Sequence, residues 1–316
     1  MAKTPVILVA VDGSDQSLTA VSYLAGILTP RQIGIELFHV KTKVPEAVFD
    51  LGSPEDTIDA DTVEYEAEIT RWTRRNGSAV NAFMETARQR FLAAGFPADS
   101  ISITIQDRQV GVARDIINRA SLGCAAVAVG RSGFGTLPDY MLGSIAAKLT
   151  ETISHVPLAV VGTRPDARKV LVAFDRSRSI RKGFEQVSTL FSRTIEEILL
   201  CHIVRPLSAP HPATTPAFHP RHESHWLSEN TRKIIPAMVE AKQHLARIGF
   251  DPDHFQTAIL KEKASRADGL AKEAQFQGFG TIVIGRRGAT TVEDFSMGRV
   301  TRKVLSLAPE KSIWIV

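Results

Sequence analysis

The sequence predicts an α/β protein made of two tandem, doubly wound domains, each built on a parallel β-sheet. Its 316 residues exceed the usual size of a single core and suit two domains of about 150 residues. Short runs rich in Val and Ile alternate with stretches of helical periodicity, which is typical of a doubly wound sheet. Motifs of the first half also recur, in the same order, in the second half, which indicates a duplicated domain.

Five pairs of segments carry this internal repeat. VILVAVDGSDQS at 6–17 is echoed by VLVAFDRSRSI at 170–180, IELFHV at 35–40 by ILLCHIV at 198–204, FLAAGFPAD at 91–99 by LARIGFDPD at 245–253, AVAVGRSG at 126–133 by TIVIGRRG at 281–288, and VPLAVVG at 156–162 by KSIWIV at 311–316. A period of roughly 155 to 163 residues is too long for a solenoid unit and fits whole domains. We therefore expect domains at 1–163 and 164–316, with GTRPDARK at 162–169 as the linker.

The strands can be predicted from the composition of short segments. The runs listed above for 6–11, 126–130 and 156–162 are nearly continuously apolar, which is typical of strands buried on both faces. A helical pattern from Val80 to Leu92 stops at Gly95, and another from Ile234 to Ile248 stops at Gly249. Glycine at these places suits the end of a helix.

Charge and composition exclude several classes of protein. A net charge of +4, spread along the chain, argues against nucleic-acid binding. No run approaches the roughly 18 apolar residues of a membrane span, and the apolar run at 6–11 ends at Asp12, too early for a signal peptide. Cys124 and Cys201 lie in apolar runs, which favours buried thiols over a reactive thiol or a disulfide. We expect a soluble, cytoplasmic protein.

The segment that follows the second strand differs most between the halves. Residues 41–76 carry acidic side chains, namely Glu55, Asp56, Asp59 and Asp61, whereas residues 205–226 are rich in Pro and contain His211, His219, His222 and His225. Four histidines invite a metal-binding interpretation. A solvated loop is the favoured interpretation, because no predicted helix sets their spacing and no Cys accompanies them.

The stretch GRSGFGTLPDYMLGS at 130–144 follows the predicted fourth strand. Glycine stands at the strand end, three residues later, and again where the next helix begins. Ligands of open parallel sheets gather at the carboxyl ends of strands where the winding reverses, so Asp12 at the end of the first strand should face this loop. Glycines that admit a phosphate, followed by a helix N-terminus, favour a phosphate cradle over a simple chain reversal.

The spacing differs from that of the P-loop and from G-x-G-x-x-G. With the order of strands and the FHV element, it resembles the universal stress protein family, whose ATP-binding members carry G-x-x-G-x9-G-[ST] after strand four and an Asp after strand one. The resemblance extends over nearly the whole chain and implies two five-stranded, Rossmann-like domains of the adenine-nucleotide alpha hydrolase type.

The resemblance also implies a nucleotide site in the first half. Adenine and ribose would lie near Val11, Asp12 and Val40, and the phosphates on Gly130, Ser132, Gly133, Gly143 and Ser144, with backbone contacts at Val129, Arg131 and Ile145. Asp12 would bind ribose hydroxyls or a phosphate-bound Mg²⁺; a helix-capping carboxylate is the alternative. The cofactor would be ATP, or else ADP or AMP, with Mg²⁺.

The second half departs from the family pattern. Its candidate residues are Asp175, Ile203, Gly285, Arg287, Gly288, Gly298 and Arg299. Arg299 stands where the family has a hydroxyl and could either clamp a phosphate or fill the pocket. Arg286 and Arg287 should make the loop more cationic, and Phe174 in the place of Val11 should narrow the adenine slot. We expect a complete site in the first half and an altered one in the second.

The motif offers hydrogen-bond donors and one Asp, but no lysine and no evident base, so it does not indicate dedicated catalysis beyond slow ATP hydrolysis. Two functions remain: a nucleotide-binding stress or signalling module, and a nucleotide-independent interaction protein of the same fold. The final strand of each half is short and apolar, so we expect these strands to pair with each other. A homodimer and unidentified protein partners stay open.

Overall fold

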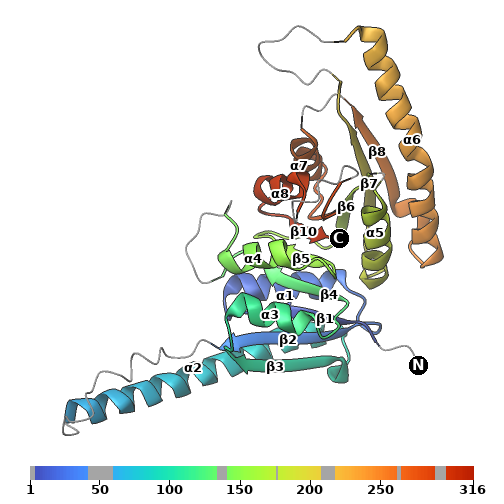
Figure 1. The fold of residues 1–316 in the computed structure, drawn as a ribbon. Coiled ribbons are helices and arrows are strands. Elements are labelled where there is room, and N and C mark those ends of the chain that lie inside the picture. Colours follow the sequence, from blue (N-terminus) through green and yellow to red (C-terminus); the bar gives the residue numbers. More distant parts are fainter. Residues whose placement is uncertain are drawn as a thin grey trace.

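The computed structural model describes residues 4–41, 60–133, 141–175, 177–207, 218–261, 265–288 and 297–316. In this part of the chain the strands form a single ten-stranded sheet in the order β3-β2-β1-β4-β5-β10-β9-β6-β7-β8 (Figure 1). Every neighbouring pair is parallel except β5 with β10. The α/β class and the doubly wound parallel sheet are therefore confirmed.

The described residues of the first half form five strands and four α-helices. They are β1 (Val6–Ala10), α1 (Asp15–Ile27), β2 (Gly34–Lys41), α2 (Ala60–Ala93), β3 (Ile101–Asp107), α3 (Val112–Ala120), β4 (Ala126–Gly130), α4 (Ser144–Thr152) and β5 (Leu158–Val161). A short 3₁₀ helix, Ala98–Ser100, precedes β3. Strand β1 pairs with β2 on one side and β4 on the other, so the winding reverses at β1.

The second half repeats this order. It contains β6 (Lys169–Ala173), α5 (Arg178–Leu190), β7 (Glu197–Val204), α6 (Pro220–Arg247), β8 (Phe255–Lys261), α7 (Arg266–Phe276), β9 (Thr281–Ile284), α8 (Arg299–Leu307) and β10 (Ser312–Ile315), with a 3₁₀ helix at Pro252–His254. Its winding reverses at β6, which pairs with β7 and β9.

The apolar core lies in two layers, one on each face of the sheet. One layer is covered by α1, α2, α5 and α6, and includes Leu24, Phe91, Phe184 and Leu245. The other is covered by α3, α4, α7 and α8, and includes Ile116, Leu149, Leu270 and Val304. Strands between two such layers must be apolar on both faces, which explains their uninterrupted runs of Val, Ile and Leu.

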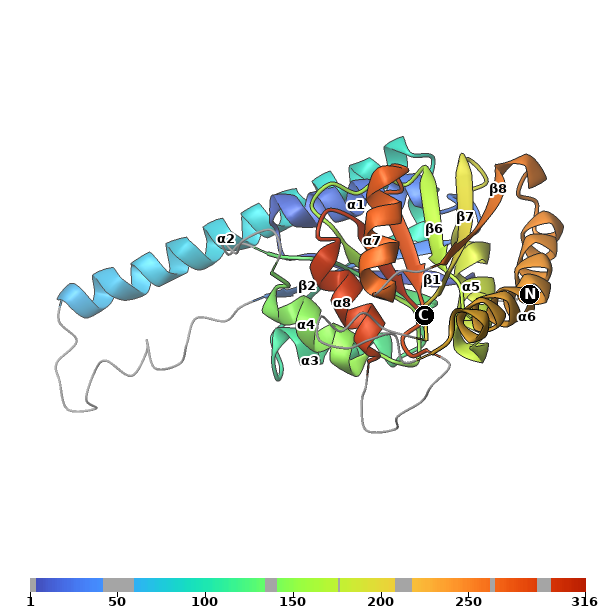
Figure 2. The same ribbon diagram turned by 90° about the horizontal axis from the view of Figure 1, so that it is seen from above.

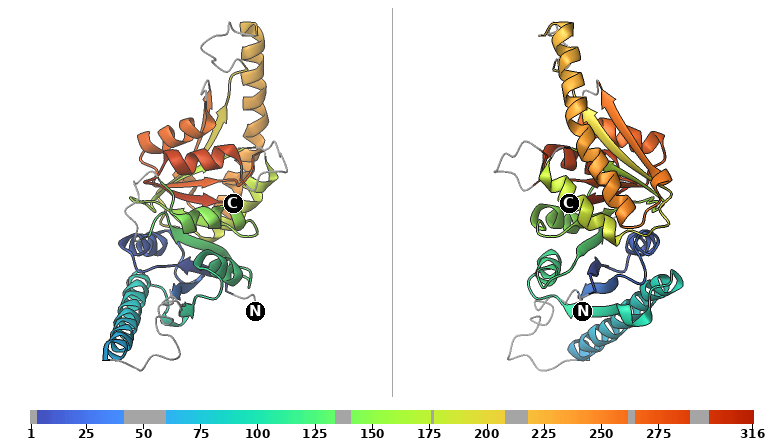
Figure 3. Two further views of the ribbon diagram at one scale, coloured as in Figure 1. Left: turned by 60° about the vertical axis from the view of Figure 1, so that its left-hand side comes forward. Right: turned by 90° about the vertical axis from the view of Figure 1, so that its right-hand side faces the viewer.

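The halves join at the middle of the sheet, where Trp314 of β10 lies opposite Ala159 of β5. Behind this pair, Trp314 Nε1 donates to the Tyr23 hydroxyl at 2.9 Å, and that hydroxyl lies 2.9 Å from Thr281 Oγ1. Burial raises the pKa of Tyr23 well above its usual range. The sheet edges β3 and β8 lie at the two far ends, beside the long helices α2 and α6 (Figure 3).

Two helices begin earlier than the periodicity predicts. Helix α2 starts at Ala60 and extends well past the sheet (Figure 2), and α6 starts at Pro220. The apolar stripe marks only the part of each helix that packs on the sheet, so it missed their outer turns. Gly95 and Gly249 do follow the helix ends, with φ of 88° and 93°.

The loop prediction for 205–226 is therefore wrong from Pro220 onward. His219 caps α6, its Nδ1 accepting from the Arg221 N–H at 3.2 Å, while His222 and His225 lie within the helix. His211 and the acidic Glu55, Asp56 and Asp59 lie outside the described residues, and Asp61 lies in α2. The described residues contain no group of three His, Cys, Asp or Glu side chains able to hold a metal ion.

Cys124 and Cys201 are free thiols, and burial raises their pKa to about 11 and about 12. No helix of the described chain is long and apolar enough to cross a membrane.

Candidate functional site

A pocket of about 550 Å³ opens at the carboxyl edge of the first-half sheet, between the ends of β1 and β4. The divergence of the chain after these strands creates it, as the winding rule predicts. All first-half candidates from the sequence line it: Val11, Asp12, Val40, Val129, Gly130, Arg131, Ser132, Gly133, Gly143, Ser144 and Ile145. The structure thus brings together residues that are more than 130 positions apart.

Asp12 is fixed in this pocket by its own local turn. Its Oδ1 atom accepts from the Ser14 N–H at 3.0 Å, from Ser14 Oγ at 2.6 Å and from Ser17 Oγ at 2.5 Å. Ser14, and not Asp12, is the N-cap of α1, since its side chain accepts from the Ser17 N–H. With Oδ1 engaged, Oδ2 faces the glycine loop, where a Cβ on Gly133 would collide with it.

The three glycines of the loop that the structure describes each sit at a close approach. A Cβ on Gly130 would lie 3.1 Å from Gln16 Cγ and 3.3 Å from the Ser132 carbonyl oxygen. A Cβ on Gly143 would lie 3.1 Å from the Arg131 carbonyl oxygen. Gln16 in turn donates to the carbonyls of Val161 and Gly162, so the glycine loop, α1 and the end of β5 form one tightly packed corner.

Two backbone N–H groups of the loop are used internally. The Arg131 N–H donates to the Val161 carbonyl at 2.8 Å and the Gly143 N–H donates to the Arg131 carbonyl at 2.9 Å. These bonds shape the cradle and leave neither N–H group for a ligand. Helix α4 begins next, and its N-cap Gly143 makes no side-chain capping bond, so the first N–H groups of α4, from Ser144 onward, lie at the pocket without a cap. Such an end favours an anion.

Much of the pocket lining is apolar. Besides Val11 and Val40 it includes side chains that the sequence did not single out as site residues, namely Ala79, Val80, Phe83, Val112 and Ile116, from α2 and α3. The periodicity of Val80 and Phe83 indicates a buried helix face, but it does not show which part of that face borders a cavity. The pocket therefore combines an apolar lining with the polar groups of Asp12 and the glycine loop.

His39 also lines the pocket, although the sequence did not single it out as a site residue. The signal that could have identified it is its recurrence as His202 in the second half. His39 Nδ1 lies 2.9 Å from the Val11 carbonyl, and His202 Nδ1 lies 2.7 Å from the Phe174 carbonyl. Since a carbonyl only accepts, Nδ1 carries the proton in both rings. Each histidine thus holds the chain at the end of the first strand of its half.

The second half keeps part of this geometry. Asp175 Oδ1 accepts from the Ser177 N–H at 2.8 Å, and a Cβ on Gly288 would lie 3.5 Å from Asp175 Oδ2. The equivalent glycines are also close to backbone oxygens. A Cβ on Gly285 would lie 3.2 Å from the Arg287 carbonyl oxygen, and a Cβ on Gly298 would lie 3.2 Å from the Arg286 carbonyl oxygen. Ile180 replaces Ser17, so the hydroxyl bond that Ser17 makes to its Asp has no counterpart there.

The remaining second-half candidates lie where the repeat puts them. Ile203 is in β7, Arg287 follows β9, and Arg299 is the first residue of α8. Phe174, like its counterpart Val11, is buried in the core, and it packs edge-on against Phe184, with ring centroids 6.5 Å apart.

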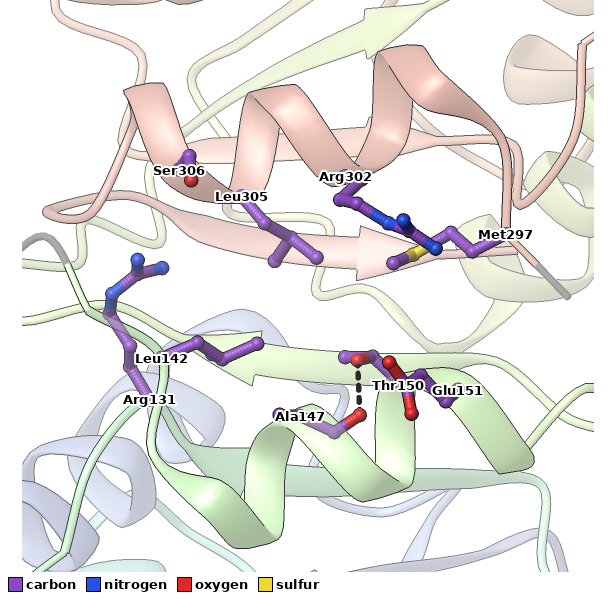
Figure 4. Close-up of a pocket in the computed structure, with 9 residues that line it drawn as sticks. All are labelled: Arg131, Leu142, Ala147, Thr150, Glu151, Met297, Arg302, Leu305 and Ser306. Carbon is purple, nitrogen blue, oxygen red and sulfur yellow. Dashed lines mark hydrogen bonds between the residues drawn. The ribbon is translucent and has the colours of Figure 1, made fainter. Parts of the chain in front are cut away.

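Arg286 makes its side-chain hydrogen bonds outside the second-half loop. Its Nη1 donates to the Thr150 carbonyl at 2.6 Å and its Nη2 to the Ile153 carbonyl, so it caps the C-terminus of α4 in the other half. Burial, and then Arg287, lowers its pKa. Its counterpart Arg131 reaches from the first-half loop toward Leu305 and Ser306 of α8, across a pocket of about 180 Å³ (Figure 4).

Comparison with known proteins gives consistent matches. The model of the universal stress protein family matches residues 4–162 and again 167–316. The universal stress protein YxiE of Bacillus subtilis (strain 168) is 26% identical over 159 residues, which are 49% of this chain and 96% of that protein. A universal stress protein from Archaeoglobus fulgidus DSM 4304 has a similar structure, with a TM-score of 0.57 at 16% identity, covering 99% of this chain and 98% of that one. A putative universal stress protein from Pseudomonas aeruginosa UCBPP-PA14 gives a TM-score of 0.56 at 15% identity, over 99% and 93%.

Proposed function

Because the chain belongs to the universal stress protein family, we propose that its first half binds an adenine nucleotide, ATP or else ADP or AMP, with Mg²⁺. The observation that carries this proposal is the pocket of about 550 Å³ lined by the whole glycine motif and by Asp12. Its volume falls within the roughly 300–1,000 Å³ of small-ligand sites. The protein would act as a stress-response or signalling module whose surface depends on nucleotide occupancy.

The two ends of the pocket suit the two ends of a nucleotide. The apolar wall around Val40, Phe83 and Val112 would take the base. The loop at Ser132 and Gly133 and the uncapped start of α4 would take the phosphates. Asp12 Oδ2, between these ends, would bind the ribose hydroxyls or a phosphate-bound Mg²⁺.

The proposal also includes the cellular location and the partners of the protein. The two free thiols, Cys201 buried and Cys124 half-buried, suit a reducing cytoplasm. The partners would be proteins, or a second copy of the chain, and not nucleic acid. A nucleotide-independent interaction protein of the same fold is the alternative function. It would use the same sheet and helices but leave the pocket without a nucleotide.

Replacing Gly133 with Ala tests the proposal, because the added Cβ would meet the Asp12 carboxylate inside the cradle. We expect ATP titrated with Mg²⁺ in a calorimeter to bind the variant at least ~30-fold more weakly, a difference of about 2 kcal/mol. Gly77→Ala is the control, because nothing lies within 4 Å of a Cβ at that position. If wild-type protein binds no ATP, or if Gly133→Ala binds like wild type, the pocket is not the nucleotide site.

A further inference from the structure

The second half carries four arginines where the first half has neutral residues. Superposing the repeats places Arg205 opposite Thr42, Arg266 opposite Val112, Arg287 opposite Ser132 and Arg299 opposite Ser144. The first-half members of these pairs that the structure describes, Val112, Ser132 and Ser144, all line the first-half pocket. The corresponding region of the second half therefore has a very different charge.

The topology brings these arginines to one edge of the sheet. Arg205 directly follows β7, which lies between β6 and β8, and Arg266 is the first residue of α7 after β8. Arg287 follows β9 on the other side of β6, and its carbonyl accepts from Ser179 Oγ at 3.2 Å. These positions surround Asp175 at the carboxyl end of β6, where the winding of the second half reverses.

The charges in this group are close enough to affect one another. The pKa of Arg266 lies below its ordinary value, first because packing removes water from the guanidinium and then because Arg205 is near; Asp175 opposes the shift. Arg205 Nε is buried and has no hydrogen-bond partner among the described residues. A buried, unpaired donor beside a second cation is costly, and an anion would relieve both costs.

Two apolar residues of the first-half pocket lining are replaced at the corresponding positions of the second half. Ala237 stands where the first half has Phe83, and Arg266 stands in place of Val112. Among the described residues, this edge carries guanidinium groups and the start of α8, whose N-cap Gly298 makes no side-chain capping bond.

We propose that the carboxyl edge of the second half, around Arg205, Arg266 and Arg287, binds a compact anion that carries several phosphate groups and no purine base. Planar guanidinium groups bind phosphate oxygens in pairs, and several of them on one small area match the closely spaced charges of linked phosphates. The proposal does not depend on nucleotide binding in the first half. The chain would then sense two different ligands.

Calorimetric titration with sodium tripolyphosphate tests the proposal on the full-length protein. We expect wild type to bind it, and Arg266→Val, which restores the first-half residue, to bind at least ~10-fold more weakly. The loss caused by Arg266→Val is measured in the Gly133→Ala background, where the added Cβ blocks the first-half cradle, so that phosphate bound there does not contribute. Citrate, an anion of similar charge without phosphate, should bind at least ~10-fold more weakly than tripolyphosphate.

Arg247→Val is the matched control, because it removes one arginine from the far end of α6. If Arg247→Val weakens tripolyphosphate binding as much as Arg266→Val does, the effect comes from the overall charge of the protein. That result would overturn the proposed site. Absence of wild-type binding at millimolar tripolyphosphate, or equal binding of citrate, would also overturn it. If Arg266→Val does not fold, as judged by its thermal melting, Arg205→Thr takes its place with the same expected loss.

Discussion

At the scale of single residues, the account depends on how Asp12 is held. Three donors from Ser14 and Ser17 fix one carboxylate oxygen, and the absence of a side chain at Gly133 leaves space beside the other. In the second half Ile180 replaces Ser17, and Asp175 is held by the Ser177 N–H through its Oδ1. The identical Asp is therefore less constrained there, which agrees with a different ligand at each site.

Removing one donor from Asp12 should weaken the nucleotide site measurably. We expect Ser17→Ala to lower the free energy of unfolding by about 1–2 kcal/mol, because a short bond to a carboxylate is lost. ATP should bind ~5-fold more weakly, since Asp12 becomes mobile. Urea denaturation and calorimetry measure the two effects. Ser121→Ala, which removes an exposed hydroxyl bonded to its own helix, is the control, and an equal loss there would contradict the role of Ser17.

The two thiols should be inert in the folded protein. Burial raises the pKa of Cys201 to about 12 and that of Cys124 to about 11, so the reactive thiolate forms only as the pH rises far above the usual range for a thiol. We expect iodoacetamide at pH 8 to modify neither thiol of native protein during an hour, and both in urea. Intact mass measures the modification. Rapid labelling of native Cys201 would contradict its burial.

At the scale of elements, glycine spacing and strand ends predicted the polar end of the pocket, because these signals are local in sequence. The apolar wall could not be predicted in the same way. Val80, Phe83 and Ile116 belong to helices whose place over the sheet depends on packing. Because the outer turns of α2 and α6 carry no stripe of buried apolar residues, the sequence pattern also failed to predict where these two helices begin.

Arg286 shows a second limit of the sequence. Its place in the loop predicted a more cationic loop, but its guanidinium caps α4, because the two halves pack so that the end of α4 lies within its reach. We expect Arg286→Met to lower the free energy of unfolding by about 2–4 kcal/mol, because two buried carbonyls lose their donor. Urea denaturation measures this loss. Arg302→Met, on the exposed part of α8, should cost less than ~0.5 kcal/mol, and a similar cost for both would contradict the capping role.

At the scale of the whole molecule, the antiparallel β5–β10 pair turns two repeats into one continuous sheet. The hydroxyl of Tyr23 sits behind this junction and connects α1 of the first half with β9 and β10 of the second. Because both partners of Tyr23 come from the other half, this bond is made only when the halves are docked. The two repeats should accordingly unfold as one cooperative unit.

Tyr23→Phe tests this coupling. It leaves Trp314 Nε1 buried without its acceptor, so we expect a loss of about 1–3 kcal/mol in the free energy of unfolding. Combining it with Thr281→Val in a double-mutant cycle should give a coupling energy of at least ~0.5 kcal/mol. Denaturation followed by tryptophan fluorescence and by circular dichroism should give coincident transitions. Two separate transitions, or additive losses, would contradict the junction.

The most direct test of the central claim, that only the first half is a nucleotide site, is the number of ATP molecules bound per chain. The matched variants Gly130→Val and Gly285→Val place the same bulk in equivalent corners, where an added Cβ lies 3.1 Å from Gln16 Cγ and 3.2 Å from the Arg287 carbonyl oxygen. Calorimetric titration with Mg²⁺ and ATP should give one ATP per wild-type chain, none with Gly130→Val, and one with Gly285→Val. Two ATP per chain, none in wild type, or a loss caused by Gly285→Val would contradict the account.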